Sequence, residues 1–206
     1  MRFIILYVSL LLLFSCKKEE NIHIVALNPV TGEHYAGLEY VVVSSRTTAN
    51  EEKYRTEASG TLNSNGEAMV SIKQKSGRTY SIRVVEPENT CYNKQITQFF
   101  DSPFDVNGTF TFEFAECAYL KQEIVNVNCQ GANDIFNIMD RYTYTEWSSW
   151  SVDVLGCYSN TTGDYFKVPS GKRFFKWQVN RSGVLEEGID SITFNPGEYK
   201  VLTINY

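Results

Sequence analysis

Histidine and carboxylate side chains are the first residues to consider for catalysis. His23 lies inside an apolar run and His34 follows a turn, and neither belongs to a metal-binding or nucleophile–base motif. Two carboxylates held about 5–9.5 Å apart can hydrolyse glycosides without a histidine. The chain has 24 Asp and Glu residues, and sequence spacing alone does not define such a pair. We therefore expect a protein that is not an enzyme and needs no cofactor or metal, with a small hydrolase as the alternative.

An aromatic cluster offers a different chemistry, contact with sugar rings or with another protein. Trp147 and Trp150 are three residues apart, and Tyr142 and Tyr144 come just before them. Such rings provide large amphipathic contact areas. Residues three apart point to opposite faces of a regular strand, so a bend or turn here would expose at least one tryptophan. Two interpretations follow: the rings fill a core, or they form a platform for a glycan or protein partner.

The first residues indicate export. Residues 3–14 are apolar except for Ser9, and Arg2 precedes them. A 12-residue run is too short to span a ~30 Å hydrocarbon core but suits a signal peptide. Leu13-Phe14-Ser15-Cys16 resembles the lipobox of bacterial lipoproteins. The resemblance implies cleavage before Cys16 and lipidation of its thiol and new amino group, which would anchor the protein durably in a membrane. A plain secretory signal is the alternative.

The residues after Cys16 bear on localisation and partners. Lys17-Lys18-Glu19-Glu20 resembles the charged leader of Bacteroidota lipoproteins, which often accompanies export to the cell surface. We expect an outer-membrane protein that faces the medium, with a periplasm-facing position as the alternative. Loss of residues 1–15 removes one charge, Arg2, and changes the net charge from −5 to −6. This acidic balance argues against a nucleic-acid partner.

Two weaker motifs remain. Asp105-Val106-Asn107-Gly108 offers oxygen ligands of the kind that calcium uses, but the rest of a binding loop is missing, so we expect an ordinary turn. Asp190-Ser191-Ile192 matches the short Asp-Ser/Thr-apolar signal for O-glycosylation in Bacteroidota. Ser191 is therefore a candidate glycosylation site, which would decorate the protein without explaining its function.

Four cysteines remain beside Cys16: Cys91, Cys117, Cys129 and Cys157. In an exported protein they suggest two disulfides, with three possible pairings. We favour Cys91–Cys117 and Cys129–Cys157. A zinc site is the competing interpretation, although C-x-x-C pairs are missing and both histidines are distant in sequence.

Short strands are the elements that would position these residues. Apolar or alternating runs are separated by turn residues such as Asn65-Gly66, and helical periodicity is scarce. We predict an all-β protein with two consecutive Greek-key β-sandwich domains, Ig-like or transthyretin-like, at residues 22–116 and 117–206. A cleaved signal peptide (1–15) and a lipidated, charged spacer (16–21) precede them.

Six runs are predicted strands of the first domain, with a long loop or weak edge hairpin at 46–59: 22–27, 38–45, 68–73, 79–85, 91–99 and 109–115. The last run alternates, so Phe110, Phe112 and Phe114 should share one face. Seven runs are predicted in the second domain, where 134–140 has a short helix as its competitor: 119–128, 134–140, 149–158, 164–168, 173–179, 189–194 and 198–206.

Residues 22–86 contain three motifs of turn and strand residues: Asn28-Pro29-Val30-Thr31-Gly32-Glu33 followed by Ala36-Gly37, Gly60-Thr61-Leu62-Asn63-Ser64-Asn65-Gly66-Glu67-Ala68, and Tyr80-Ser81-Ile82-Arg83-Val84. This third of the chain resembles the transthyretin-like domain known as the carboxypeptidase regulatory-like domain, although the loop at 46–59 is longer than the family usually carries. The resemblance implies a seven-stranded Greek-key sandwich with an accessory or structural role and no catalytic residues. The second domain resembles no family that we recognise.

The expected function is that of a non-enzymatic, membrane-anchored envelope lipoprotein with a structural or protein-binding role. The first alternative is a surface glycan-binding lipoprotein of a nutrient-uptake system, which predicts that Trp147 or Trp150 is exposed. The second alternative is the small hydrolase, which predicts a cleft lined by paired carboxylates with raised pKa values.

Overall fold

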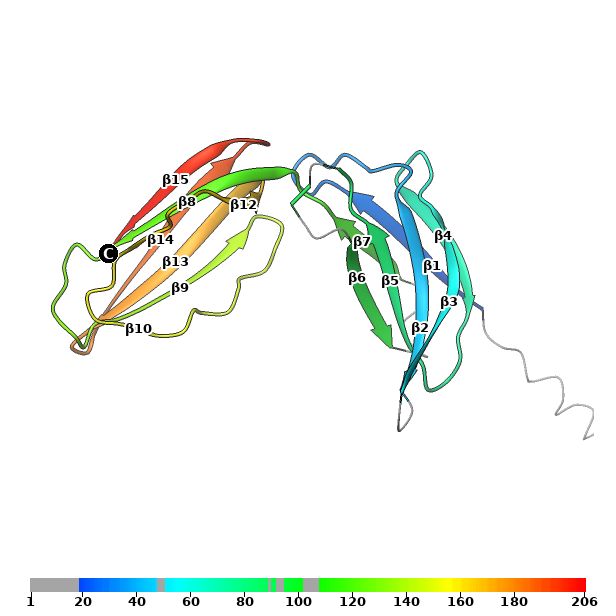
Figure 1. Ribbon diagram of the computed structural model, residues 1–206, viewed down its shortest axis with the longest axis horizontal. Helices are drawn as coiled ribbons and strands as arrows, with labels where there is room; N and C mark the ends of the chain where they lie inside the picture. Colours follow the sequence, from blue (N-terminus) through cyan, green and yellow to red (C-terminus); the bar gives the residue numbers. More distant parts are fainter. Residues whose placement is uncertain (1–18, 48–50, 89, 92–94, 102–107) are drawn as a thin grey trace, which may run out of the picture. The chain divides into compact units, whose positions relative to one another are not determined.

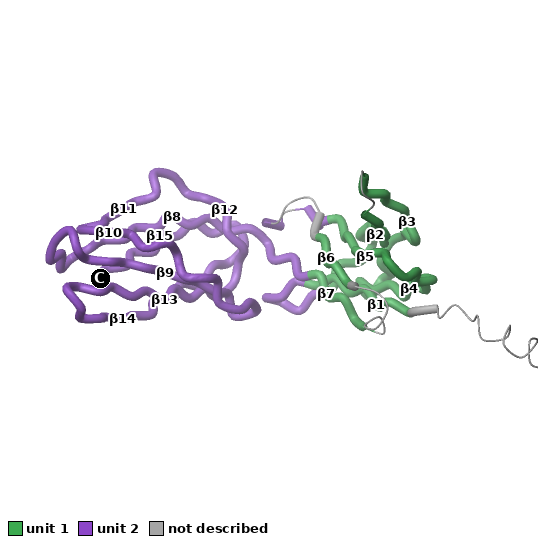
Figure 2. Tube along the Cα trace, turned by 90° about the horizontal axis from the view of Figure 1, so that it is seen from below, with its two compact units in different colours: residues 1–27, 34–85, 94–112 green, residues 28–33, 86–93, 113–206 purple. Residues whose placement is uncertain are grey.

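A computed structural model describes residues 19–47, 51–88, 90–91, 95–101 and 108–206. In these residues all regular secondary structure is β (Figure 1). The chain divides into two compact units, coloured separately in Figure 2. The first unit comprises residues 1–27, 34–85 and 94–112, and the second comprises residues 28–33, 86–93 and 113–206. Cys16 and residues 105–107 of the candidate calcium turn lie outside the described residues.

The first unit is a seven-stranded sandwich of two sheets. One sheet has the order β4-β1-β7, formed by Glu67–Lys73, Glu19–Leu27 and Thr109–Glu113. The other has the order β3-β2-β5-β6, formed by Glu52–Thr61, Glu39–Thr47, Thr79–Val85 and Gln95–Asp101. This non-sequential order is typical of Greek-key sandwiches. Alternate residues of the strands point inward and form the core: Ile22, Ile24, Val42, Val70, Ile72, Tyr80, Ile82, Val84, Phe100 and Phe112.

Two predictions for this unit can be compared directly with the structure. Phe112 and Phe114 are fully buried and Phe110 is half-buried, as the period-two pattern predicted. Residues 46–59 contain an edge hairpin in place of a long loop, because β3 pairs with β2 along its length. Most β3 side chains are exposed, so backbone hydrogen bonds define this strand and hydrophobicity does not. The predicted strand 91–99 is shifted to β6, Gln95–Asp101.

The second unit is also a β-sandwich. Its first sheet has the order β10-β9-β13-β14, formed by Val154–Leu155, Ile135–Tyr142, Gly171–Arg181 and Val184–Phe194. In its second sheet β8 (Cys117–Val125) pairs in parallel with β15 (Tyr199–Asn205), and antiparallel with β11 (Asn160–Thr161) and β12 (Phe166–Pro169). The core consists of two adjoining clusters of buried residues: Ala118, Leu120, Val168, Phe175, Phe194, Leu202 and Ile204; and Ile124, Phe136, Val179 and Tyr206.

Residues 134–140, predicted as a strand with a short helix as the alternative, form strand β9. Residues 149–158 were predicted as one strand, but only Val154–Leu155 is a strand. The preceding segment follows β9 irregularly: Ser148 and Ser151 donate backbone N–H bonds to Asp140 and Ile138 (both 2.8 Å). The Oγ atoms of the same serines accept the N–H groups of Asp140 and Ile138 at 2.9 and 3.0 Å. These hydroxyls accept the backbone N–H groups that carbonyl groups of a neighbouring strand would accept in a regular sheet. The hydrophobic pattern of the sequence does not reveal this substitution.

Both disulfides occur in the pairing that the sequence favours. Cys91 is bonded to Cys117 and Cys129 to Cys157, with Cα–Cα distances of 4.8 and 5.2 Å. The zinc interpretation is therefore wrong, since these sulfurs are consumed by covalent bonds. Disulfides of this kind are typical of proteins that fold in an oxidising compartment outside the cytoplasm.

A close contact between β13 and β14 gives a testable stability prediction. Gly188 pairs with Trp177, and a Cβ atom at Gly188 would lie 2.2 Å from the indole ring. The same indole Nε1–H donates a 2.9 Å hydrogen bond to Asp190, which restricts how far the ring can move. We expect Gly188→Ala to lower the free energy of unfolding by about 1–3 kcal/mol through overpacking, measured by urea titration.

The matched control for that variant is Gly163→Ala. A Cβ atom at Gly163 meets nothing within 4 Å, and the backbone there is not left-handed. Its free energy of unfolding should stay within about 0.5 kcal/mol of the parent value, as for most surface substitutions. Equal effects of the two substitutions would contradict the assigned contact with Trp177.

Candidate binding surface

The outer face of the β10-β9-β13-β14 sheet gathers cationic and aromatic side chains. Phe175 and Val179 of β13 point into the core, so Phe174 and Lys176 point to the opposite face. The strand register places Phe174 beside Arg141 of β9. Phe174 and Lys176 lie on β13, whose backbone is fixed by pairing with β9 and with β14.

The irregular segment beside β9 adds both tryptophans to this face. The guanidinium carbon of Arg141 lies 5.0 Å from the centre of the Trp147 ring and 5.3 Å from that of Phe174. Lys172 Nζ lies 4.9 Å from the Phe174 ring, and Lys176 Nζ lies 5.7 Å from the Trp150 ring. We call this surface the tryptophan face and define it by six residues: Arg141, Trp147, Trp150, Lys172, Phe174 and Lys176.

The four-residue aromatic platform predicted from the sequence is divided by the fold. Trp150 is 37% exposed and Trp147 is half-buried, and neither belongs to the two described core clusters. Tyr142 is buried, because it follows Arg141 in the strand and so points to the opposite side of the sheet. Tyr144 stacks on Tyr142 with ring centres 5.3 Å apart and donates its hydroxyl to the Ser170 carbonyl at 3.1 Å.

The cations of the tryptophan face differ in whether a carboxylate lies close enough to neutralise their charge. Lys176 has an acidic neighbour, since its Nζ lies 3.5 Å from a carboxylate oxygen of Glu187. Within the described part of the chain, neither Arg141 nor Lys172 has a carboxylate oxygen within 4 Å. By contrast, Arg173, next to Lys172 but on the opposite side of the strand, binds Asp140 through two 2.8 Å contacts. The face therefore presents two uncompensated positive charges on a chain whose net charge is −5.

A second aromatic group, which the sequence analysis missed, lies on the other sheet. The parallel register of β8 and β15 pairs Tyr119 with Tyr199, and their rings stack 4.2 Å apart. Tyr165 meets Tyr199 edge-on at 5.2 Å. A hollow of about 490 Å³ adjoins Tyr119 and Lys167. Tyr119 and Tyr199 are 80 residues apart, so only the strand register could have revealed the group.

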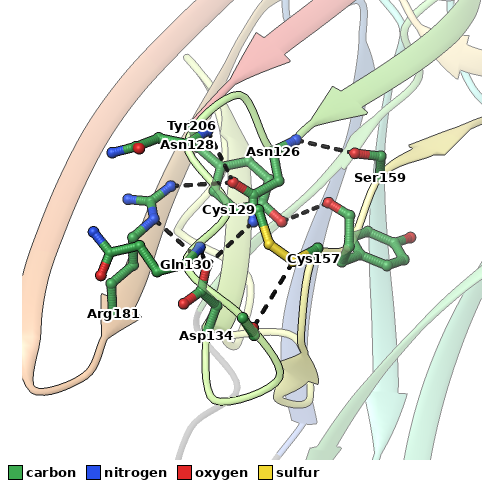
Figure 3. The surroundings of a disulfide bond; sticks show 11 residues. Asn126, Asn128, Cys129, Gln130, Asp134, Cys157, Ser159, Arg181 and Tyr206 are labelled. Atoms are coloured by element: carbon green, nitrogen blue, oxygen red, sulfur yellow. Dashed lines mark hydrogen bonds and ion pairs between the residues drawn. A yellow bond between two sulfur atoms is a disulfide. The ribbon is translucent and has the colours of Figure 1, made fainter.

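A buried ionic network lies beside the Cys129–Cys157 disulfide (Figure 3). The Arg181 side chain is fully buried, with 3.6 Å between its Nε and Asp134 and 2.6 Å between its Nη1 and Glu186. Asp134 also accepts the backbone N–H of Gln130 at 3.0 Å, which ties the disulfide-bearing loop to β13. Arg181 and Asp134 are shielded from solvent, whereas the Glu186 side chain is 45% exposed. The network thus joins the interior to the surface, and we assign it a structural role.

Tyr206 forms one side of that network. The Arg181 guanidinium carbon lies 5.7 Å from the Tyr206 ring, and the Tyr206 hydroxyl donates to the Tyr158 carbonyl at 2.7 Å. Burial raises the pKa of Tyr206 above its ordinary value, because a phenolate would be poorly solvated there. The phenol of Tyr206 is therefore a neutral, hydrogen-bonded part of the core.

The remaining candidate residues are dispersed. His23 Nδ1 lies 3.2 Å from Thr109 Oγ1, whereas His34 Nδ1 lies 2.6 Å from the Asn65 carbonyl. The described residues contain no group of three or more His, Cys, Asp or Glu side chains that could hold a metal ion. Burial raises the pKa of Glu113, and no second carboxylate contributes to that shift. Ser191 is exposed and pairs with Phe174 in the sheet.

Comparisons with known proteins show only distant likeness. No family model matches the chain, and no curated protein matches it. Among solved structures, the Bacillus anthracis TIE protein has a TM-score of 0.34 and 16% identity over 91% of this chain and 34% of its own. A streptococcal ancillary pilin has a TM-score of 0.35 and 14% identity over 93% of this chain and 63% of its own. A variant of the shaft pilin SpaA from Lactobacillus rhamnosus GG has a TM-score of 0.37 and 6% identity over 91% of this chain and 98% of its own.

The chain thus spans about a third of the TIE protein and 63% of the ancillary pilin. Likenesses this distant carry no argument about activity or partners. The part of the chain that the structure describes contains no helix long and apolar enough to cross a membrane. What this chain does must therefore be argued from its own residues, which form two β-sandwich units, the second of which contains both disulfides.

Proposed function

We propose that this protein is a non-enzymatic lipoprotein of the outer membrane that is anchored through Cys16, faces the medium, and binds a glycan or protein partner through the tryptophan face. The domains at 22–116 and 117–206 have different roles. The first domain, which resembles the carboxypeptidase regulatory-like domain, serves as an accessory scaffold. The second domain presents the binding surface.

Two observations support export and anchoring. The lipobox-like residues that end at Cys16 and the two disulfides both fit an extracytoplasmic protein. Strand β1 begins at Glu19, three residues after Cys16. An extended chain spans at most about 3.6 Å per residue, so about 11 Å separates the anchor from the first strand. The first unit would therefore lie against the membrane surface.

The observation that carries the binding role is the placement of three large rings on the outside of a rigid sheet. Trp147, Trp150 and Phe174 contact cations at the surface and do not fill the described core clusters. Aromatic and Arg side chains are enriched at binding surfaces, because they combine apolar area with directional contacts.

The hydrolase alternative receives no support from the described residues. It requires two carboxylates that raise each other's pKa within a cleft. The raised pKa of Glu113 is caused by burial and not by an acidic neighbour. O-glycosylation at Ser191 stays a proposal. Ser191 is exposed but pairs with Phe174, so a glycan there would lie at the tryptophan face and compete with a ligand.

Removing both tryptophans should abolish binding without unfolding the protein. We expect Trp147→Ala combined with Trp150→Ala to weaken affinity for the partner at least tenfold, about 1.4 kcal/mol, since two contact rings are lost. The measurement is a screen of the purified protein against arrays of polysaccharides and cell-surface proteins, followed by titration of each hit. Tyr199→Ala is the matched control, because it removes an exposed ring from the opposite sheet. Loss of binding in Tyr199→Ala and retention in the tryptophan variant would place the site at the tyrosine group instead.

A further inference from the structure

We propose that the ligand of the tryptophan face is an acidic polysaccharide, whose anionic groups bind at Arg141 and Lys172 while its sugar rings contact Trp147, Trp150 and Phe174. This inference rests on the proposed function, because it specifies the chemical class of the partner for the same surface.

The positive charges of Arg141 and Lys172 favour an anionic ligand. Arg141 and Lys172 contact the same Phe174 ring, at 5.3 and 4.9 Å, and neither has a carboxylate within 4 Å in the described residues. Two cations that contact one ring repel each other, and a bound anion offsets that repulsion. The chain is acidic overall, so these two cations without a carboxylate partner form a local surplus of positive charge. The charge complementarity points to an anionic ligand.

The Arg141 side chain is held in place before a ligand binds. The Arg141 guanidinium carbon lies 5.0 Å from the centre of the Trp147 ring and 5.3 Å from that of Phe174. A guanidinium that contacts two rings can still direct N–H groups at its edge to a bidentate contact with a carboxylate or sulfate. The rings limit the rotation of this side chain, so less conformational entropy is lost when an anion binds.

The backbone of the face favours a sugar polymer over a peptide. Strand β13 is paired on both sides, with β9 and with β14, so its N–H and C=O groups are already bonded. On its outer side β9 is followed by the segment of Ser148 and Ser151, which bonds to Asp140 and Ile138. A peptide that adds to a sheet needs a free strand edge for its main chain. A polysaccharide needs only ring faces and side-chain donors, which this surface supplies.

Titration of the full mature chain in detergent against polygalacturonate and heparin tests the inference. Highly methyl-esterified polygalacturonate is the matched ligand, because it has the same sugar backbone with its charge removed. Polyglutamate represents an acidic polypeptide. The protein variants are Arg141→Gln and Lys172→Gln, with Lys167→Gln as the control. Lys167 is an exposed cation on the other sheet, so all three variants lose one positive charge.

We expect at least one of the two acidic polysaccharides to bind, with an affinity that falls at least tenfold in each face variant and less than twofold in Lys167→Gln. Binding should weaken as salt is added, and the methyl ester should bind at least tenfold more weakly than polygalacturonate if the latter is a ligand. Absence of binding to both acidic polysaccharides overturns the inference. Equal binding of the methyl ester, or tighter binding of polyglutamate, also overturns it.

Failure of this inference is distinguishable from failure of the proposed function. A neutral glycan or a protein that binds in a tryptophan-dependent manner would leave the proposed function standing and would exclude only the acidic class. A ligand whose affinity is unchanged by the double tryptophan substitution would contradict the proposed function itself.

Discussion

Replacing Arg181 with methionine is expected to lower the free energy of unfolding of the second unit by about 3–5 kcal/mol. The Arg181 side chain is fully buried and lies between Asp134, Glu186 and the ring of Tyr206. Methionine retains much of the volume, so the main loss is the charge. Asp134, whose side chain is only 2% exposed, would then keep a carboxylate in the interior without its cation.

Tryptophan fluorescence during urea titration measures this effect selectively. All three tryptophans (Trp147, Trp150 and Trp177) lie in the second unit, so the signal reports on that unit alone. The control combines Arg181→Met with Asp134→Asn and removes both buried charges. We expect it to recover at least half of the loss, because the stranded carboxylate is gone. A loss below about 1 kcal/mol in the single variant would contradict the structural role assigned to the network.

Removing the Cys129–Cys157 disulfide with serine at both positions is expected to destabilise the second unit by more than the roughly 3–4 kcal/mol that chain entropy gives. The bond closes a loop with a sequence separation of 28 residues, and its loss increases the entropy of the unfolded chain. The same loop carries Gln130, whose backbone N–H binds Asp134. The effect should therefore exceed what the chain entropy alone predicts.

The comparison variant replaces Cys91 and Cys117, which close a loop of nearly equal separation, 26 residues, away from the Arg181 network. Chain entropy predicts nearly the same loss for both pairs. Because residues 94–112 of the Cys91–Cys117 loop belong to the first unit, circular dichroism, which follows both units, measures the two losses. A larger loss at Cys129–Cys157 would support coupling between the disulfide and the network. Equal losses would assign the whole effect to loop closure.

The fold class could be predicted because strand periodicity is a local property. The alternation at Phe110, Phe112 and Phe114 identified β7 correctly, and the turn residues marked most strand boundaries. Strand β3 was harder to identify, since its side chains are exposed and its pairing with β2 leaves no hydrophobic signal. The segment beside β9 was predicted as a strand, although the hydroxyls of Ser148 and Ser151 take the place of carbonyl groups.

The candidate surface could be predicted only in part. Trp147 and Trp150 were identifiable because they are close in sequence, but their cationic neighbours come from β9 and β13. The pairing of Arg141 with Phe174 depends on a strand register that spans 33 residues, and single-sequence patterns do not encode it. The tyrosine group was not predicted for the same reason, because the register of β8 and β15 places Tyr119 beside Tyr199.

Proteinase digestion of intact cells, with lysed cells as the control, tests the central claim most directly. If the protein is anchored through Cys16 and faces the medium, it should be lost from intact cells while a periplasmic marker protein survives. The tryptophan face would then be accessible to extracellular ligands. Survival of the protein until the cells are lysed would contradict a surface position and would place its partner inside the envelope.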